Sequence, residues 1–200
     1  MARSRAKLEI ESLIIGSEIV RKLDCLYKQF LETKKKCLIV GRGAIGKAVY
    51  NALVPTGKEV RIIDIETSIN SVPLDEIDMV IGCTGKHSFC TELTKSVQNQ
   101  LLLASASSSD REFGAVETRI LHAQNNDTHK DYAYRNTILA NSGFPINFDG
   151  QSVFTPVEKM EVTLALVFIS VCHLASNTLP AGIQPFPKEE DEFICTFFKS

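Results

Sequence analysis

The fold follows from one stretch of the chain, Cys37-Leu-Ile-Val-Gly-Arg-Gly-Ala-Ile-Gly46. Its first part is a short apolar run that ends at glycine, which is typical of a strand buried on both faces of a sheet. The three glycines have the spacing Gly-x-Gly-x-x-Gly, and the residues from Ala44 to Leu53 have a helical pattern that ends before Pro55. A strand, a glycine turn and a helix in this order predict the start of a βαβ unit.

Similar elements follow along the chain. Apolar runs predict a helix and three further strands, at Ser88–Val97 and at Glu59–Ile65, Asp78–Cys83 and Leu101–Ser105. Strands that alternate with helices predict the α/β class, here a doubly wound parallel sheet of the Rossmann type with helices on both faces. The alternating residues of Asp131–Ala140 favour two more short strands.

We expect a single domain with flanking helices at both ends. Residues 1–34 would hold an N-terminal helix, with a helical apolar stripe between Leu8 and Thr33, and residues 35–154 the dinucleotide-binding domain. Residues 155–200 would form a C-terminal helix and a tail packing on that domain. Thr155, Pro156 and Glu158 have the pattern of a capped helix start, and the helix should run to about Ser176.

Composition and charge exclude several classes of protein. A net charge of −2 gives no long-range attraction for nucleic acid or an anionic membrane, so neither is an expected partner. The apolar run from Val162 to Ala175 is shorter than the ~20 residues that cross a bilayer, and predicts a buried helix. The six cysteines include no Cys-x-x-Cys pair, which disfavours zinc and favours reduced thiols in a cytoplasmic protein.

Each glycine of the loop has a distinct expected role. Gly41 allows the tight turn out of the strand, Gly43 lets the backbone approach a pyrophosphate, and Gly46 lets the helix pack close to the sheet. The helix start at Ala44 and Ile45 would direct free N–H groups at the phosphates. A dinucleotide is therefore the expected ligand. A nucleoside-triphosphate P-loop is excluded, because Lys47 is followed by alanine and the spacing is wrong.

An acidic residue after the second strand is the expected partner of the adenosine ribose. Asp64, with Ile65 beside it, stands at about the right distance from the loop, and Glu66 is an alternative acid. A carboxylate there accepts hydrogen bonds from the ribose hydroxyls and repels a 2′-phosphate, which favours NAD over NADP as the cofactor. Arg61 lies within the strand, away from the usual place of a phosphate-binding arginine.

Other candidate positions follow the later strands. Thr84 and Gly85 should face the cofactor, because ligands of open sheets lie beyond the carboxyl ends of the strands; the alternative is a plain turn. Ser105 could contact the nicotinamide ribose, or the residues after it could cap a helix. Asn147 could bind the carboxamide, although its pattern alone indicates a turn. His87 could reach the nicotinamide, or be a loop histidine in solvent.

These residues resemble the NAD-binding domain of adenosylhomocysteinase (S-adenosyl-L-homocysteine hydrolase). The resemblance runs from about residue 10 to the end, and it is sharpest at Gly41–Lys47 with Asp64, where the family has a glutamate. It implies that Asn147 binds the nicotinamide carboxamide. The other matching segments are Ser12–Gly16, Thr84–Gly85, Leu139–Ala140, Phe154–Thr155 and Pro185–Lys188 with Asp191–Glu192.

Several family features have no counterpart in this chain. The substrate domain with its catalytic acids and lysine is not matched, and Ser107–Ser108 replaces the family's Gly-His after the fourth strand. The resemblance therefore implies an NAD-binding module of one-carbon metabolism without its own hydrolase activity. The alternative is an oxidoreductase or hydrolase subunit whose substrate site another chain completes. The catalytic residues are unknown; His87 and Asp110 are the local candidates. The apolar tail at Phe197 and Phe198 favours a homodimer.

Overall fold

The structure is a computed structural model that describes residues 4–64, 72–88, 97–114, 129–148, 157–177 and 179–199. The chain divides into two compact units, each described by itself below. One consists of Gly16–Gln151 and is called the sheet unit; the other, the helical unit, consists of Met1–Ile15 and Ser152–Ser200. The sequence places boundaries after residues 34 and 154, whereas the sheet unit already begins within the first long helix.

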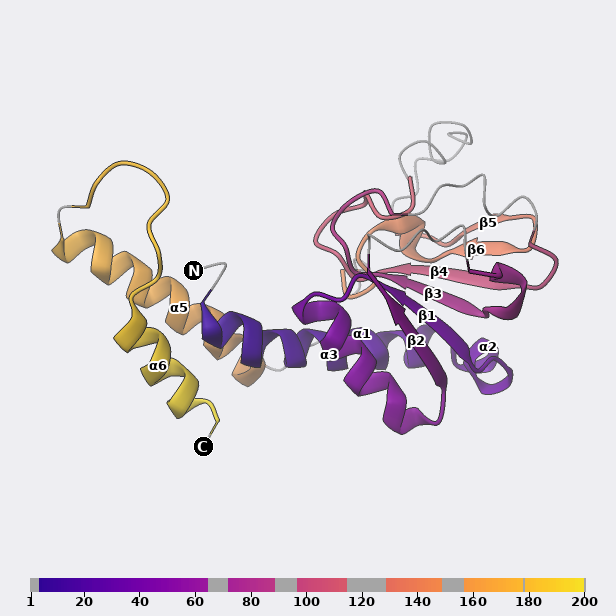
Figure 1. Cartoon of the computed structure of the whole chain (residues 1–200), viewed down its shortest axis with the longest axis horizontal. Coiled ribbons are helices and arrows are strands. Elements are labelled where there is room, and N and C mark those ends of the chain that lie inside the picture. The colour runs from indigo at the N-terminus through magenta and orange to yellow at the C-terminus, as the bar shows by residue number, and fades with distance from the viewer. Residues whose placement is uncertain are drawn as a thin grey trace. The chain divides into compact units, whose positions relative to one another are not determined.

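Six strands form the sheet, in the order β2-β1-β3-β4-β6-β5 (Figure 1). Every neighbouring pair is parallel except β5 with β6. Because β2 and β3 lie on opposite sides of β1, the chain reverses its direction of winding at β1. This order confirms the doubly wound Rossmann-type α/β fold. The strands are β1 (Lys36–Val40), β2 (Glu59–Ile63), β3 (Met79–Gly82), β4 (Leu101–Ser105), β5 (Tyr132–Tyr134) and β6 (Thr137–Leu139).

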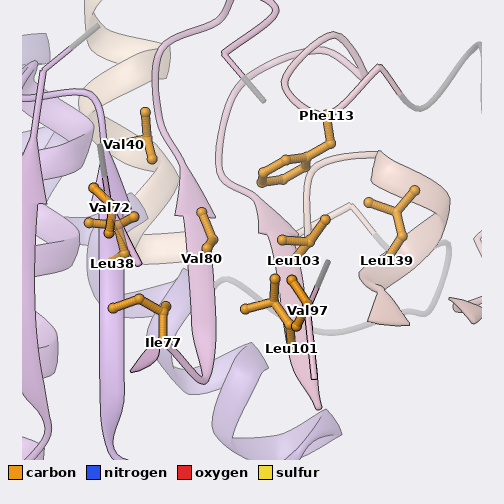
Figure 2. Packing of buried hydrophobic residues seen from close by; sticks show 10 residues of the cluster. All are labelled: Leu38, Val40, Val72, Ile77, Val80, Val97, Leu101, Leu103, Phe113 and Leu139. Atoms are coloured by element: carbon orange, nitrogen blue, oxygen red, sulfur yellow. The ribbon is translucent and has the colours of Figure 1, made fainter. Parts of the chain in front are cut away.

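The central strands are apolar because side chains on both of their faces are buried. Every residue of β3 and β4 is buried, as a central parallel strand requires. On one face, alternate residues of four strands pack with Phe113 and with residues of the connecting segments in a single apolar cluster (Figure 2). The cluster consists of Leu38, Val40, Val72, Ile77, Val80, Val97, Leu101, Leu103, Phe113 and Leu139.

The predicted helices near the glycine loop are present, and they differ from the prediction in where they break. Helix α6 (Lys188–Phe197) lies where the sequence predicts a tail. Helix α3 (Ala44–Leu53) has the predicted bounds and contacts β1 and β2. The predicted helix between Leu8 and Thr33 is divided into a π-helical turn η1 (Lys7–Glu11), α1 (Ser12–Leu26) and α2 (Lys28–Thr33). Most of the predicted helix at Ser88–Val97 lies outside the described residues. Three short 3-10 helices are η2 (Val54–Thr56), η4 (Leu74–Glu76) and η6 (Ala140–Gly143).

Helices α1 and α3 touch at a glycine. A Cβ atom added at Gly16 would lie 2.6 Å from the Ala48 carbonyl carbon and 2.7 Å from its Cβ atom. These distances are too short for any side chain, so the two helices approach as closely as they do only because residue 16 lacks one. The first residues of the sheet unit are thereby fixed to the helix that carries the glycine loop.

Substituting Gly16 by valine should destabilise the sheet unit. The added atoms meet α3 backbone, which cannot give way like a flexible side chain, so we expect a loss of about 1–3 kcal/mol, the scale of core overpacking. Denaturant unfolding of the variant measures this loss. Cys25→Val on the exposed part of the same helix is the matched control, since it adds the same side chain without a backbone contact. Equal stability of the two variants would contradict the close contact.

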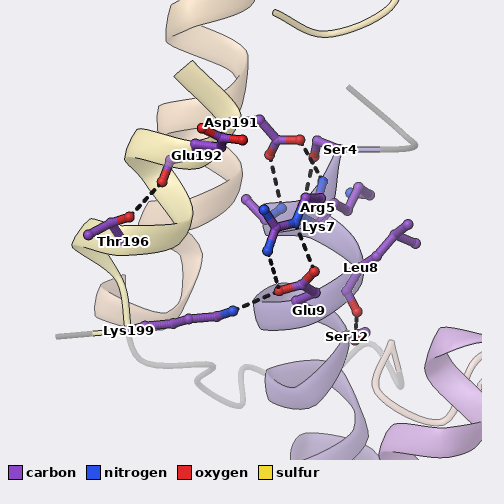
Figure 3. Close-up of polar contacts among 11 residues, drawn as sticks. Ser4, Arg5, Lys7, Leu8, Glu9, Ser12, Asp191, Glu192, Thr196 and Lys199 are labelled. Atoms are coloured by element: carbon purple, nitrogen blue, oxygen red, sulfur yellow. Dashed lines mark hydrogen bonds and ion pairs between the residues drawn. The ribbon is translucent and has the colours of Figure 1, made fainter. Parts of the chain in front are cut away.

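A small apolar cluster and the Asp191 carboxylate connect the N-terminal segment of the helical unit to its C-terminal helices. The unit contains α5 (Val157–Ser176) and α6 (Lys188–Phe197), and Ala6, Val162, Leu166, Ile194 and Cys195 form the buried cluster. Asp191 of α6 accepts hydrogen bonds from the backbone N–H groups of Arg5 (2.6 Å) and Ala6 (3.0 Å) (Figure 3). The carboxylate thus satisfies orphan donors at the start of the N-terminal helix, as a capping residue does.

A second carboxylate joins the two ends of the chain. Glu9 binds the Arg5 guanidinium at 3.0 Å and the Lys199 ammonium at 2.7 Å (Figure 3). The hydrogen bond from Arg5, followed by that from Lys199, lowers the pKa of Glu9 to about 2. The Arg5 and Lys199 side chains are about half exposed and that of Glu9 is partly exposed, so this network orients the terminal segments more than it stabilises them.

The prediction that α5 is a buried helix is wrong. Of its side chains that the structure describes, Val162 and Leu166 are buried, whereas Leu164, Phe168, Val171 and Leu174 are all more than half exposed. The apolar run predicts a helix whose apolar side chains need a packing partner, but it does not show that this partner belongs to the same chain.

Among the described residues, no helix has the length and apolarity to cross a membrane. Of the two phenylalanines of the apolar tail, Phe197 is exposed and Phe198 packs on the apolar cluster of the helical unit. The homodimer stays a prediction.

Candidate functional site: the glycine loop and its neighbours

The glycine loop begins, directly after β1, with a backbone conformation that only glycine adopts without strain. Gly41 has a φ of +111°, and its N–H donates to the Ile63 carbonyl of β2 at 2.8 Å. A Cβ atom at this position would lie 2.9 Å from the carbonyl group of Cys83. Both the conformation and the close neighbour therefore require glycine, as the sequence predicts for the tight turn.

The other two glycines are required for different reasons. A Cβ atom at Gly46, in the first turn of α3, would lie 1.8 Å from the carbonyl oxygen of Gly41. The helix can therefore start directly against the end of β1 only with glycine there, which fits the predicted close packing. Gly43 has a φ of −68°, where any residue is tolerated, and no heavy atom lies within 4 Å of its Cβ position. Nothing in the described part of the protein itself accounts for glycine at position 43.

The loop presents the start of α3 at the carboxyl edge of the sheet. The first intrahelical bond runs from the Lys47 N–H to the Gly43 carbonyl at 3.0 Å. The N–H groups of Ala44, Ile45 and Gly46 precede it and have no partner within the helix, which is the usual state of a first helical turn. Such a turn carries the positive end of the helix dipole, and it attracts phosphate groups.

The predicted ribose-binding acid follows the strand next to the loop. Asp64 comes directly after β2, and its side chain is exposed. Since β2 is hydrogen-bonded along β1, the end of β2 lies beside the loop, where the sequence places the ribose. Ile65 and the alternative acid Glu66 lie outside the described residues.

The loop after β3 is organised by a buried glutamate. The Glu112 carboxylate is fully buried and accepts hydrogen bonds from the Thr84 hydroxyl (2.9 Å), the Gly85 N–H (2.5 Å) and the Ser88 hydroxyl (2.7 Å). Gly85 has a φ of +69°, so the turn alternative describes its backbone correctly. Thr84 and Gly85 stand at the carboxyl edge next to Gly41, but a polar group of each is bound to Glu112. Their contact with a cofactor stays a prediction.

Sequence reasoning missed Glu112 entirely. It lies in an irregular segment 28 residues after Thr84, and it belongs to no motif. The one signal for it is Gly82: a Cβ atom there would lie 2.8 Å from a carboxylate oxygen of Glu112. A glycine inside a strand that is otherwise apolar indicates a close approach of another group, but it does not say which group approaches.

Ser105 and Asn147 are brought to the same edge by a strained turn. Asn141, Ser142 and Gly143 all have positive φ (51°, 51° and 81°), and the Asn141 amide donates to the Pro145 and Phe148 carbonyls. The turn directs the chain back along β4, where the Ile146 N–H donates to the Ser105 carbonyl at 2.8 Å. Asn147 therefore follows a fixed residue next to the end of β4. Left-handed residues other than glycine are strained, and such strain often marks a functional segment.

The Ser105 side chain is directed into its own loop. It is fully buried, and its hydroxyl lies 3.2 Å from the Ser107 hydroxyl, which in turn donates to the Ser109 carbonyl at 2.9 Å. Residues 107–114 form turns, so the described structure has no helix there for Ser109 or Asp110 to cap. The predicted contact of Ser105 with a nicotinamide ribose stays a prediction.

The histidines and buried thiols near the site form no metal centre among the described residues. His87 is exposed, as the alternative of a loop histidine expects, and His129 lies 3.0 Å from the Asn141 side chain. Burial raises the pKa of the Cys37 thiol to about 12, and burial, with Glu112 second, raises that of Cys83 further still. Both thiols are therefore protonated and inert at neutral pH. Within the described ranges no group of His, Cys, Asp and Glu side chains could hold a metal ion.

Comparison with known proteins gives relatives by sequence and by structure. No family model matches the chain. Two uncharacterized proteins of Mycobacterium tuberculosis, one from strain CDC 1551 / Oshkosh and one from strain ATCC 25618 / H37Rv, are each 34% identical to it over 185 residues. Each alignment covers 86% of this chain and 36% of the relative. The chain thus spans about a third of the length of the curated relatives that it matches.

Among solved structures, the chain is similar to two bacterial oxidoreductases. One is an NADPH-dependent glyoxylate/hydroxypyruvate reductase from Sinorhizobium meliloti, in apo form, with a TM-score of 0.46, 11% identity, and coverage of 90% of this chain and 86% of that one. The other is a dehydrogenase from Rhizobium meliloti, with a TM-score of 0.45, 15% identity, and coverage of 87% and 66%. Both scores are low, and the fold class rests on the strand order and register of this chain.

Proposed function

We propose that the chain is a dinucleotide-binding module that holds NAD(H) at the glycine loop and Asp64. The observation that carries this proposal is Gly43, whose glycine identity has no cause in the described protein. Gly41 and Gly46 are each explained by a neighbouring backbone group, whereas the space around Gly43 is open. A pyrophosphate over the start of α3 would occupy that space and would leave no room for a side chain. The residues therefore fit the group.

Asp64 supports NAD as the dinucleotide. Its exposed carboxylate, next to the end of β2, is placed to accept hydrogen bonds from the adenosine ribose hydroxyls. The same negative charge opposes a 2′-phosphate. Thr84, Gly85, Ser105 and Asn147 stand at the ends of the strands beyond β1, on the side where the nicotinamide half would lie. When bound, the cofactor supplies hydride chemistry, and this chain supplies its binding and orientation.

The resemblance to the cofactor domain of adenosylhomocysteinase supports a module without its own hydrolysis. The sharpest matches are in the glycine loop and at the position of the ribose acid, while the family's substrate-binding residues are not matched in this sequence. We therefore expect the chain, tested by itself, to bind the cofactor and to leave adenosine and homocysteine adducts unchanged.

The substitution Gly43→Ala tests the proposal. Because the Cβ position is open and φ is ordinary, the variant should be as stable as the wild type without ligand. In the wild type, NAD at 100 times its Kd should add about 2.7 kcal/mol of stability. The alanine methyl should remove this gain, and thermal unfolding with and without NAD measures it. An unchanged NAD-induced rise in Tm in the variant, or no rise in the wild type at millimolar NAD and NADH, would overturn the proposal.

A second candidate is a hydride-transferring subunit whose substrate site another polypeptide segment completes. It is favoured by the length of the curated relatives, of which this chain spans about a third. Incubation with NAD, an adenosine or homocysteine adduct and the remaining two thirds of such a relative should then produce the absorbance of NADH. If that mixture forms no NADH although the chain still binds NAD, the second candidate is excluded and the binding module stands.

A further inference from the structure

Arg42 lies between the first two glycines of the loop and extends across the edge of the sheet. Its side chain is exposed, and its Nη2 atom donates to the Ile62 carbonyl of β2 at 3.4 Å. The backbone of Arg42 follows β1, so the guanidinium reaches from the end of β1 to the neighbouring strand. The sequence draws attention to Arg61 and Asp64 on that strand, and gives no role to Arg42.

The guanidinium contacts the strand whose end carries the expected ribose-binding acid. Ile62 is two residues before Asp64, whose carboxylate we assign to the ribose hydroxyls. A cationic side chain bonded to Ile62 and a carboxylate two residues further along are thus both found at the end of β2. Both residues follow directly after hydrogen-bonded backbone, because β2 pairs with β1 up to Ile63 and the Gly41 N–H donates to the Ile63 carbonyl.

We propose that Arg42 recognises the 2′ position of the adenosine ribose and allows the site to accept a 2′-phosphate, so that the chain binds NADP as well as NAD. This inference rests on the proposed dinucleotide function. It assigns the chemical class of the ligand more finely: a dinucleotide with or without a phosphate monoester on the adenosine ribose.

The chemistry of the two side chains supports this assignment. A guanidinium presents several N–H donors in a plane that matches phosphate oxygens, and it stays charged at all working pH values. Its contact with the Ile62 carbonyl is long for a hydrogen bond and uses one donor, so a phosphate can engage the others without a large loss. Asp64 opposes the phosphate, but both charges are exposed to solvent and salt, which weakens the repulsion. NAD is then preferred by a modest factor, and NADP is not excluded.

Arg61 provides a matched control within the same strand. Its side chain is also exposed and carries the same charge, but its Cα atom is paired with Leu38 in the interior of the strand, before the edge is reached. Removal of the Arg61 charge lowers the overall positive charge by the same amount as removal of the Arg42 charge. A difference between the two variants therefore reports position and not net charge.

Isothermal titration of the full chain with NAD and with NADP tests the proposal. We expect wild-type protein to bind both, and Arg42→Gln to raise the Kd for NADP by about tenfold more than the Kd for NAD, the scale of one charge-assisted hydrogen bond. Arg61→Gln should leave the ratio of the two Kd values unchanged. Asp64→Asn should lower the Kd for NADP and raise that for NAD. The Kd for NADP should increase more steeply with salt in the wild type than in Arg42→Gln.

The outcomes separate this inference from the proposed function. Wild-type binding of NAD without binding of NADP at millimolar concentration would overturn the role of Arg42 and leave the dinucleotide module intact. An equal loss of both affinities in Arg42→Gln would also overturn it, because the side chain would then support the loop or the adenine and not the 2′ position. Binding of neither dinucleotide by folded wild-type protein would remove the proposed function, and this inference with it. The Tm of each variant without ligand verifies folding.

Discussion

Gly46→Ala is expected to lose both stability and dinucleotide binding. The added methyl carbon would lie 1.8 Å from the carbonyl oxygen of Gly41, and both partners are backbone-fixed. The start of α3 must move away from β1 to relieve this overlap, which displaces the N–H groups of the first helical turn. We expect a loss of about 3 kcal/mol or more, at the upper end of overpacking costs, because no flexible side chain can absorb the clash. Denaturant unfolding measures the stability, and titration with NAD measures the binding.

The matched variant for this experiment is Gly43→Ala, three residues earlier in the same loop. It introduces the same methyl group where no heavy atom lies within 4 Å, so it should lose binding at unchanged stability. The two alanines thus separate the architectural glycine from the ligand-facing one. If Gly46→Ala unfolds at the same denaturant concentration as wild type, the helix start does not pack against the strand end as described.

Glu112→Ala is expected to be the most destabilising substitution of a polar residue at this edge. It leaves the Gly85 N–H without its acceptor, leaves the Thr84 and Ser88 hydroxyls with only the Lys86 and residue 112 backbone carbonyls, and opens a cavity beneath the turn. Hydrogen bonds to charged groups contribute about 1.5–3 kcal/mol each, so a total loss of about 3 kcal/mol or more follows even with partial rescue by water. Chemical denaturation followed by circular dichroism measures it.

Two further variants define the cause. Glu59→Ala removes an exposed glutamate from β2 and should change stability by about 0.5 kcal/mol or less. Glu112→Gln keeps the volume but places an amide donor against three donors, so it should recover only part of the loss. A Glu112→Ala protein as stable as Glu59→Ala would show that the turn after β3 does not depend on this carboxylate.

The sequence was sufficient for the α/β pattern because the central strands are buried on both faces. The run Leu101–Leu102–Leu103–Ala104 is apolar throughout, so it is recognised as a buried strand from composition alone. The β5–β6 pair was harder, since strands of three residues carry a weak alternation that does not fix their direction. The break between α1 and α2 at Tyr27 has no glycine or proline to announce it.

The residues of the candidate site also fall into those that the sequence predicts and those that it does not. The glycines and Asp64 are visible in sequence because they belong to one local segment with a known spacing. Glu112 and the side-chain direction of Arg42 depend on which strands become neighbours, and that is decided by the fold. In the helical unit, the exposed apolar face of α5 shows what hydropathy cannot predict. It indicates that the helix needs a packing partner, but it does not identify that partner.

The bond between Glu112 and the turn at Thr84 also has a consequence for biosynthesis. A nascent polypeptide that has been translated only as far as β4 already contains every residue of the glycine motif, yet the turn beside it still lacks its acceptor. Closing such a loop requires long-range contacts, which form more slowly than local helices and turns. A truncated fragment ending before residue 112 would therefore carry the recognisable signature and still lack the carboxylate that fixes the turn after β3.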